Sequence, residues 1–179
     1  DVVVVPAGSC ATMMRKFWPE LFELVGDNDR AGRAANLAER TFEFSEFLDE
    51  RRSATRLPNA QTTPPESTVA YHHSCHMLRE LGIKEAPLEL LRDAGLAVTD
   101  WADSERCCGF GGMFSFKLPE VSVAMADEKL ASFSEGDTTT LVGCDISCLL
   151  HLRARAEHEG VPIQIRHLAE VLVERRAES

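Results

Sequence analysis

The stretch 138-TTTLVGCDISCLLHLRARAEH-158 decides the fold class of this chain. Thr138–Val142 has the short apolar and β-branched pattern of a strand, and Cys148–His158 has the pattern of a helix. A tight turn that contains Cys144 lies between the two segments. A strand, a turn and a helix in this order predict one unit of an α/β fold, in which parallel strands alternate with helices.

The same order of elements recurs along the chain. Further strands are expected at Val2–Val5, Val69–His72, Leu96–Val98 and Pro162–Ile165. Helices are expected at Met13–Phe22, from Asp27 onward with Leu37, Phe42, Phe44 and Phe47 as core positions, and at Met77–Leu81, Leu88–Ala94, Pro119–Phe133 and His167–Arg176. The sequence therefore predicts an α/β fold with a mostly parallel sheet flanked by helices.

An internal repeat indicates that the fold is duplicated. When Cys10 is aligned with Cys148, the apolar run 3–5 falls on 141–143, and each cysteine follows a serine. Both copies read as a strand, a tight turn, Ser-Cys and a helix. We therefore expect two pseudo-duplicated halves, with Cys10 ending the motif of the first half.

The composition and net charge indicate which classes of binding partner suit this chain. The chain has 179 residues and a net charge of −10. This sign repels phosphate groups and makes nucleic acid and anionic membranes poor partners. The sequence has no apolar run of the roughly 18 residues that a membrane span needs, and its opening lacks a secretory signal. We therefore expect a cytoplasmic protein, in which six clustered cysteines serve metal or redox chemistry and not disulfides.

The cysteines are expected to meet at one edge of the sheet. In chain order the later groups are Cys75, Cys107-Cys108, Cys144 and Cys148. Each group follows an expected strand or lies in a loop. The carboxyl ends of parallel strands form the usual ligand-binding edge of an open α/β sheet, so residues distant in sequence converge there.

Thiolates at this edge favour an iron–sulfur cluster. These soft ligands select zinc or iron–sulfur clusters, and a structural zinc site usually combines two Cys-x2–4-Cys pairs. Only Cys144 and Cys148 have such a spacing, whereas the adjacent Cys107 and Cys108 reach different irons of one cluster more easily than one ion. Three glycines would let the backbone approach the cluster and donate N–H groups to its sulfurs. They are Gly109, Gly111 and Gly112.

From these residues alone, two other functions remain as alternatives to an iron–sulfur protein. Vicinal thiols form a labile disulfide, so Cys107 and Cys108 also suit a thiol–disulfide reductase. The second alternative is a non-catalytic, zinc-stabilised interaction module, which would bind about one zinc ion.

The cysteine pattern resembles that of the cysteine-rich CCG family. This family includes a subunit of heterodisulfide reductase and the iron–sulfur subunits of glycolate oxidase and anaerobic glycerol-3-phosphate dehydrogenase. Its motif is a cysteine, a Cys-Cys-Gly and a Cys-x-x-Cys, usually present twice. Within the family the chain is most similar to lactate-utilisation and glycolate-oxidase iron–sulfur subunits. The similar stretches are 5-VPAGSC-10, 71-YHHSCH-76, 107-CCGFGG-112 and 167-HLAEVL-172.

The resemblance implies a division of the chain into two halves. Residues 1–52 would be the remainder of the first CCG half, and residues 68–179 would be the second half. Residues 53–67, rich in Pro, Thr, Asn and Gln, would form a semi-rigid linker. The chain opens within a strand and lacks the first cysteine and Cys-Cys-Gly of half one. We therefore expect the beginning of that half to be missing.

The resemblance also implies ligands for a 4Fe–4S cluster, which is noncubane in the reductase relatives. The matching thiols are Cys75, Cys107, Cys108 and Cys148, and Cys10 matches the last cysteine of the first site. Asp145 replaces the first cysteine of Cys-x-x-Cys, with Cys144 one residue earlier. Three alternatives remain: Cys144 substitutes as a ligand, Asp145 ligates weakly, or four thiolates hold a cubane cluster.

By resemblance, the chain is an electron-transfer subunit of a complex that oxidises a 2-hydroxy acid, L-lactate or glycolate. Nothing in the sequence supplies a flavin or nicotinamide site, so we expect partner subunits of the complex to oxidise the substrate.

For the other polar residues considered, structural or solvent-exposed roles are favoured over ligand binding. His72, His73 and His76 flank Cys75, and a strand-end or capping role is favoured for them, with His76 the best candidate ligand of the three. His167 is expected to cap or pack the last helix. Arg79, Lys117 and Lys129 are interpreted as solvated charges.

Overall fold

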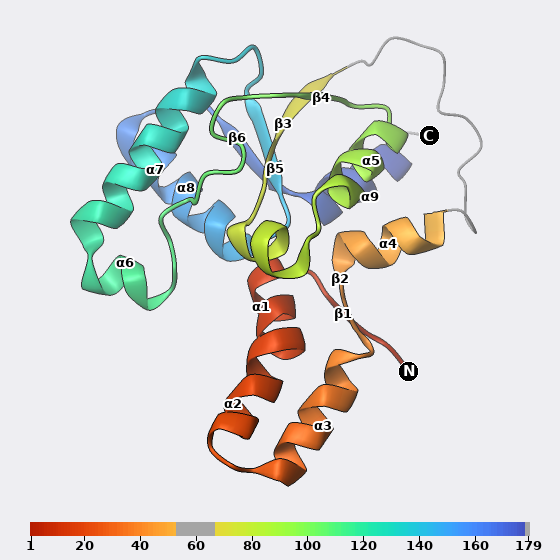
Figure 1. The fold of residues 1–179 in the computed structure, drawn as a ribbon. Coiled ribbons are helices and arrows are strands. Elements are labelled where there is room, and N and C mark those ends of the chain that lie inside the picture. The colour runs from red at the N-terminus through yellow and green to blue at the C-terminus, as the bar shows by residue number, and fades with distance from the viewer. Residues whose placement is uncertain (53–66, 178–179) are drawn as a thin grey trace.

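The larger sheet has four parallel strands (Figure 1). In the computed structural model, which describes residues 1–52 and 67–177, the strand order is β4-β3-β5-β6 and every neighbouring pair is parallel. The strands are β3 (Thr68–His72), β4 (Ala97–Thr99), β5 (Thr140–Gly143) and β6 (Gln164–His167). Parallel strands joined through helices confirm the predicted α/β class.

Helices cover both faces of this sheet (Figure 1). Tyr71 and Val142 point to one face, where they pack against α4, α5 and α9, whereas Ala70 and Leu141 point to the other, against α7 and α8. Successive residues of a strand face opposite sides, and this alternation divides the core into two layers. The bounds are α4 (Phe44–Arg52), α5 (Glu85–Asp93), α7 (Pro119–Ser134), α8 (Ile146–Glu159) and α9 (Leu168–Ala177).

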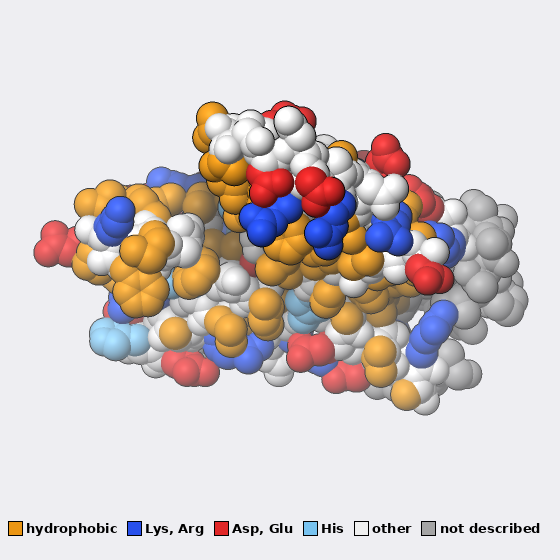
Figure 2. All heavy atoms as spheres, turned by 90° about the horizontal axis from the view of Figure 1, so that it is seen from below, with side chains coloured by type: hydrophobic (Ala, Val, Ile, Leu, Met, Phe, Trp, Pro, Cys, Tyr) orange, Lys and Arg blue, Asp and Glu red, His pale blue; other side chains and the backbone are white. Residues whose placement is uncertain are grey.

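A second, two-stranded sheet lies beside the first, and a helical hairpin projects from it (Figure 1). Its elements are β1 (Val3–Val5), α1 (Gly8–Thr12), the π-helical turn η1 (Met13–Phe17), α2 (Trp18–Leu24), α3 (Asn28–Ala38) and β2 (Thr41–Glu43). Asp27 starts α3, because its side chain accepts a hydrogen bond from Arg30 N–H at 3.1 Å. Seen from below, the surface carries charges of both signs around exposed apolar side chains (Figure 2).

The expected repeat is visible in matching strand-to-helix junctions. Val5 pairs with Glu43 as Gly143 pairs with His167. Glu43 N–H donates to the Glu46 carboxylate at 3.2 Å, and His167 N–H donates to the carboxylate three residues later at 3.0 Å. The side chains of Glu43 and His167 each accept the backbone N–H two residues further on, at 2.7 and 3.1 Å. The expected capping role of His167 is therefore confirmed.

Hydrogen bonds also cross between the two repeats. Ser9 N–H donates to the Asp145 carboxylate at 2.7 Å. His167 Nδ1 accepts the Ala169 N–H, so its Nε2 carries the proton and donates to the Pro6 carbonyl at 3.0 Å. The two sheets are thus joined where the turn after β1 meets the turn after β5 and the end of β6.

Three details differ from the sequence prediction. Phe42 lies in β2 and not in a helix, because the backbone of Thr41–Glu43 pairs with β1. A short helix, α6 (Met113–Lys117), follows the glycine-rich loop and was not predicted. Helix α5 begins at Glu85, so that Pro87 lies within its first turn, where no intrahelical N–H bond is lost.

Residues 53–66 of the expected linker lie outside the described residues. In the part of the chain that the structure describes, no helix has the length and apolar character needed to cross a bilayer.

Candidate metal centre

Four of the six cysteines gather at the carboxyl edge of the larger sheet. Cys75 follows β3, Cys107 and Cys108 lie in the loop after β4, and Cys148 lies in the first turn of α8. The thiols of Cys75 and Cys107 interact directly, as do those of Cys107 with Cys108 and of Cys108 with Cys148. The predicted convergence of these four residues is therefore present in the fold.

Gly109 gives the Cys107-Cys108 loop its tight path over α7. Its φ is +90°, a region that favours glycine, and an added Cβ would overlap the Ser122 carbonyl. The Ser122 hydroxyl donates to the Gly109 carbonyl at 2.7 Å. The N–H groups of Gly109 and Phe110 point back to the sulfurs of Cys107 and Cys108, at 3.4 and 3.5 Å. Backbone N–H groups of this loop are thus directed at the thiols.

The other two glycines serve the turn in a different way. Gly111 and Gly112 have φ values of +53° and +58° and lead into α6. No hydrogen bond from either N–H to a sulfur occurs within the described residues. Their role in holding a cofactor, which the sequence suggested, stays a prediction.

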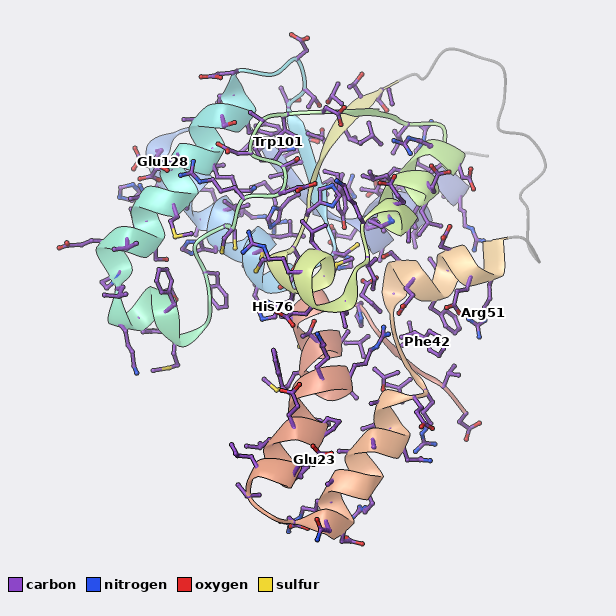
Figure 3. All side chains as sticks on the ribbon, in the orientation of Figure 1. Glu23, Phe42, Arg51, His76, Trp101 and Glu128 are labelled. Atoms are coloured by element: carbon purple, nitrogen blue, oxygen red, sulfur yellow. The ribbon has the colours of Figure 1, made fainter. Side chains whose placement is uncertain are left out.

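Lys129 is a second anchor of the loop, and its interpretation as a solvated charge is wrong. The side chain is only 1% exposed. Its ammonium group donates to three backbone carbonyls before Cys107: Asp103, Ser104 at 3.5 Å and Arg106 at 2.7 Å. It also lies 4.6 Å from the centre of the Trp101 ring, which Figure 3 shows between the sheet and α7.

Helix α7 therefore holds the loop on both sides of the cysteine pair. Burial lowers the pKa of Lys129 to about 8, which leaves it protonated at neutral pH with three protons for three carbonyls. Lys129 shares one face of the helix with Ser122, Ala126 and Phe133, all buried. A lysine at this helical spacing among small and apolar residues was the sequence signal for a buried cation.

The thiols of Cys75, Cys107 and Cys108 influence one another's ionisation. Hydrogen bonds from the Cys108 and Cys75 thiols lower the pKa of Cys107. Interaction with the Cys107 sulfur in turn raises the pKa of both Cys75 and Cys108. Several thiolates at this spacing require a cation among them, because like charges disfavour ionisation of their neighbours.

His72 borders the four thiols on the buried side. It is the last residue of the central strand β3 and is 1% exposed. One of its ring nitrogens and the sulfurs of Cys108 and Cys148 all lie within 4.8 Å of one another. Burial lowers the pKa of His72 to about 3, so the ring is neutral and keeps a free lone pair.

The other two histidines lie elsewhere. His73 stacks edge-on against Tyr71, with ring centroids 4.9 Å apart. His76 begins η2 (His76–Leu81), and its Nδ1 is 3.7 Å from the Cys75 sulfur. Figure 3 shows His76 where η2 approaches α1. His76 therefore contacts one thiol at the rim of the group.

Cys144 does not join the four thiols. It packs with Tyr71 in the core layer under α5 and α9, on the opposite face of the sheet from Cys108 and Cys148. Burial raises the pKa of its thiol well above the usual value, and the hydroxyls of Tyr71 and Ser45 interact with it. The strand alternation that divides the core also directs Cys144 away from the thiol group.

Asp145 is engaged by backbone N–H groups. One carboxylate oxygen accepts from Ser9 N–H at 2.7 Å, and the other accepts from Ser147 N–H at 3.2 Å. The residue is 1% exposed and caps the start of α8. Its carboxylate thus supports the fold next to Cys148.

The remaining candidates are at the surface. Cys10 is exposed on α1, and no interaction among the described residues links its thiol to the other five. Arg79 and Lys117 are exposed, as the sequence suggested.

Glu43 is a buried carboxylate beside Cys144, and its ionisation predicts a pH dependence of stability. Burial raises its pKa above 4.5. Because the folded state holds this proton more tightly than the unfolded state, the contribution is present below pH 4.5 and is lost as pH rises through the raised pKa. We expect Glu43→Gln to gain stability relative to the parent protein as pH rises from 5 to 8.

Urea denaturation across that pH range measures this difference. The exposed Glu23→Gln serves as the matched control (Figure 3). A gap between Glu43→Gln and the parent protein that stays constant with pH would contradict the assignment.

The donor set fits a metal or an iron–sulfur cluster. It combines four converging thiols with a buried, neutral imidazole, whose nitrogens find no hydrogen-bond partner in the described part of the chain. Soft sulfur donors with imidazole suit zinc or iron–sulfur clusters. Hydrogen bonds between α7 and the loop that contains residues 107–110 hold two of these thiols in place.

The comparisons with known proteins agree with this geometry. The family model of the CCG cysteine-rich domain matches residues 69–153, which contain all four thiols. "Lactate utilization protein A" of Anoxybacillus flavithermus is 39% identical over 177 residues, covering 96% of this chain and 70% of the relative. The chain belongs to the lactate utilization protein A family.

Other members of the family are equally similar. The Bacillus cereus protein of that name is 40% identical over 173 residues, with 96% of this chain and 70% of the relative covered. The Exiguobacterium protein is 42% identical over 175 residues, with 97% and 69% covered. The similarity of the lactate utilization protein A family to this chain thus extends over both sheets.

Proposed function

We propose that this chain is an iron–sulfur electron-transfer subunit of a complex that oxidises a small 2-hydroxy acid, L-lactate or glycolate. The observation that carries the proposal is the convergence of Cys75, Cys107, Cys108 and Cys148 at one sheet edge. The name of the relatives supports L-lactate as the first substrate to test.

The residues of the site suit electron transfer. The four thiolates would hold the cluster, which when bound accepts and donates single electrons. The N–H groups of Gly109 and Phe110 would stabilise negative charge on the sulfurs, and the Lys129 ammonium adds positive charge behind the loop. Oxidation of a 2-hydroxy acid to a 2-oxo acid releases two electrons and two protons in a partner subunit. This chain would receive the electrons one at a time and pass them on.

Metal analysis of single-cysteine variants tests the site. We expect the anaerobically reconstituted protein to hold about four irons and four sulfides. Cys108→Ser should lose most of this iron together with the visible absorption, because the residue lies at the centre of the thiol group. Cys144→Ser and Cys10→Ser should keep both and serve as matched controls. Stoichiometric zinc without sulfide would instead identify a zinc-stabilised module and exclude electron transfer.

Substrate reduction tests the complex. With its partner subunits present, L-lactate or glycolate should bleach the visible absorption of the parent protein and of Cys144→Ser. No bleaching with either acid, in a complex that carries its full iron content, would contradict the proposed role.

A further inference from the structure

We propose that His72 is a nitrogen ligand of the metal centre, next to Cys108 and Cys148. The inference deepens the proposed function and rests on it for the identity of the metal as an iron of a cluster. The position of the ligand rests on geometry alone.

The fold directs His72 at the two thiols. It ends β3, which pairs with β4 as far as Ala70 and with β5 through His72 itself. Its side chain lies on the same face as Ala70, the face on which Cys108 and Cys148 are buried. His72 pairs with Gly143, whose missing side chain lets Leu149 of α8 pack against the strand: a Cβ there would lie 3.0 Å from Leu149. The first turn of α8, with Cys148, therefore comes close to the histidine.

The separations suit convergence of the three donor atoms on one metal centre, for which a single tetrahedral ion gives a scale. A nitrogen at about 2.0 Å and two sulfurs at about 2.3 Å from a tetrahedral metal would lie about 3.5 to 3.8 Å apart. The three donor atoms lie within 4.8 Å of one another. A small inward adjustment of side chains completes the geometry.

In the part of the chain that the structure describes, the imidazole makes no well-formed hydrogen bond that would explain its position, and the Ser104 backbone interacts with the ring only outside hydrogen-bond geometry. Neither ring nitrogen of His72 makes a hydrogen bond within the described residues, although the side chain is buried. A buried polar group without a partner is costly, and such groups in folded proteins are nearly always paired. Metal coordination would satisfy one of these nitrogens.

The other candidate ligands have other partners or lie on the opposite face of the sheet. Both oxygens of Asp145 accept backbone N–H groups, and Cys144 lies on the opposite face of the sheet. His73 packs edge-on against Tyr71 and does not belong to the group formed by His72, Cys108 and Cys148. His72 therefore takes the position beside the four thiols that neither residue of the Cys144-Asp145 pair fills.

Pulsed electron paramagnetic resonance on the reduced, reconstituted full chain tests the proposal. With ¹⁵N-labelled histidine we expect a strong nitrogen hyperfine coupling, as directly bound imidazole gives. His72→Cys should abolish this coupling and keep the iron content, because a thiolate replaces the nitrogen. It should also lower the reduction potential, since the new ligand is negatively charged. His73→Gln is the matched control and should keep the coupling.

Two results would overturn the proposal. The first is a coupling as weak as that of an N–H···S hydrogen bond in the parent protein. The second is a strong coupling that persists in His72→Cys. If the parent protein binds zinc without sulfide, the electron-transfer function fails separately from the ligand. X-ray absorption of the zinc form then decides: a Zn–N contact that becomes Zn–S in His72→Cys supports His72 as ligand, and its absence rejects it.

Discussion

Gly109→Ala is expected to abolish assembly of the metal centre. The residue has a φ of +90°, and its new Cβ would overlap the Ser122 carbonyl and approach Met125 Cβ to 3.1 Å. Both neighbours belong to α7, whose backbone cannot move without breaking helical hydrogen bonds. Strain and steric overlap together should lower the free energy of unfolding by about 3 kcal/mol. The iron content should fall by at least tenfold, because the loop can no longer place Cys107 and Cys108.

Gly112→Ala provides a control with the same backbone requirement. Its φ is +58°, but nothing lies within 4 Å of the added Cβ. Its ψ of −111° lies outside the left-handed helical region, so alanine carries a conformational cost of about 2 kcal/mol without steric overlap, and the protein should keep its iron. Urea denaturation and iron analysis of the two variants distinguish the effect of steric overlap with α7 from the effect of the unfavourable backbone conformation. Equal behaviour of Gly109→Ala and Gly112→Ala would show that the close approach to α7 does not matter.

Lys129→Met should lower the stability of the loop that carries Cys107 and Cys108 and should also change the reduction potential of the metal centre. The substitution leaves the carbonyls of Asp103, Ser104 and Arg106 without their ammonium donor. Loss of such charge-assisted bonds should cost about 3 kcal/mol of unfolding free energy. Removal of a buried positive charge near the thiolates should also make the reduction potential more negative, because the reduced cluster carries the extra negative charge.

Lys117→Met makes the same chemical change at an exposed lysine and should leave stability and potential near their parental values. Urea denaturation measures the first quantity, and redox titration of the reconstituted protein measures the second. A parental potential in Lys129→Met protein that retains its iron would limit Lys129 to a purely structural role.

The strand-turn-helix pattern was sufficient to predict the α/β class and the meeting of four cysteines. Cys75 and Cys148 each follow a strand that the sequence pattern predicts. Parallel strands bring their carboxyl ends together at one edge of the sheet. β2 was missed for a physical reason. Phe44 and Phe47, with Leu37, fit a helical period, and Thr41–Glu43 becomes a strand only because β1, far away in sequence, pairs with it.

The site was predicted less completely than the fold. The alternation of strand β5 places Val142 and Cys144 on one face, which could have separated Cys144 from Cys148 at the outset. His72 could not be separated from its two neighbours by sequence, because all three flank the same strand end. Its unpartnered nitrogens become visible only when the loop and α8 are folded over it.

The hydrogen bonds between the repeats have a mechanical consequence. The matching junctions at Glu43 and His167 are those expected of a duplicated unit. In the repeat alignment Ala7 is the counterpart of Asp145, and alanine has no side-chain acceptor for the reciprocal bond. The Ser9–Asp145 bond therefore exists in one direction only. Because Asp145 also caps the start of α8, opening of the two-stranded sheet would remove a hydrogen bond from the residue that precedes the Cys148 turn, so movement at the beginning of the chain would be transmitted to the thiol group.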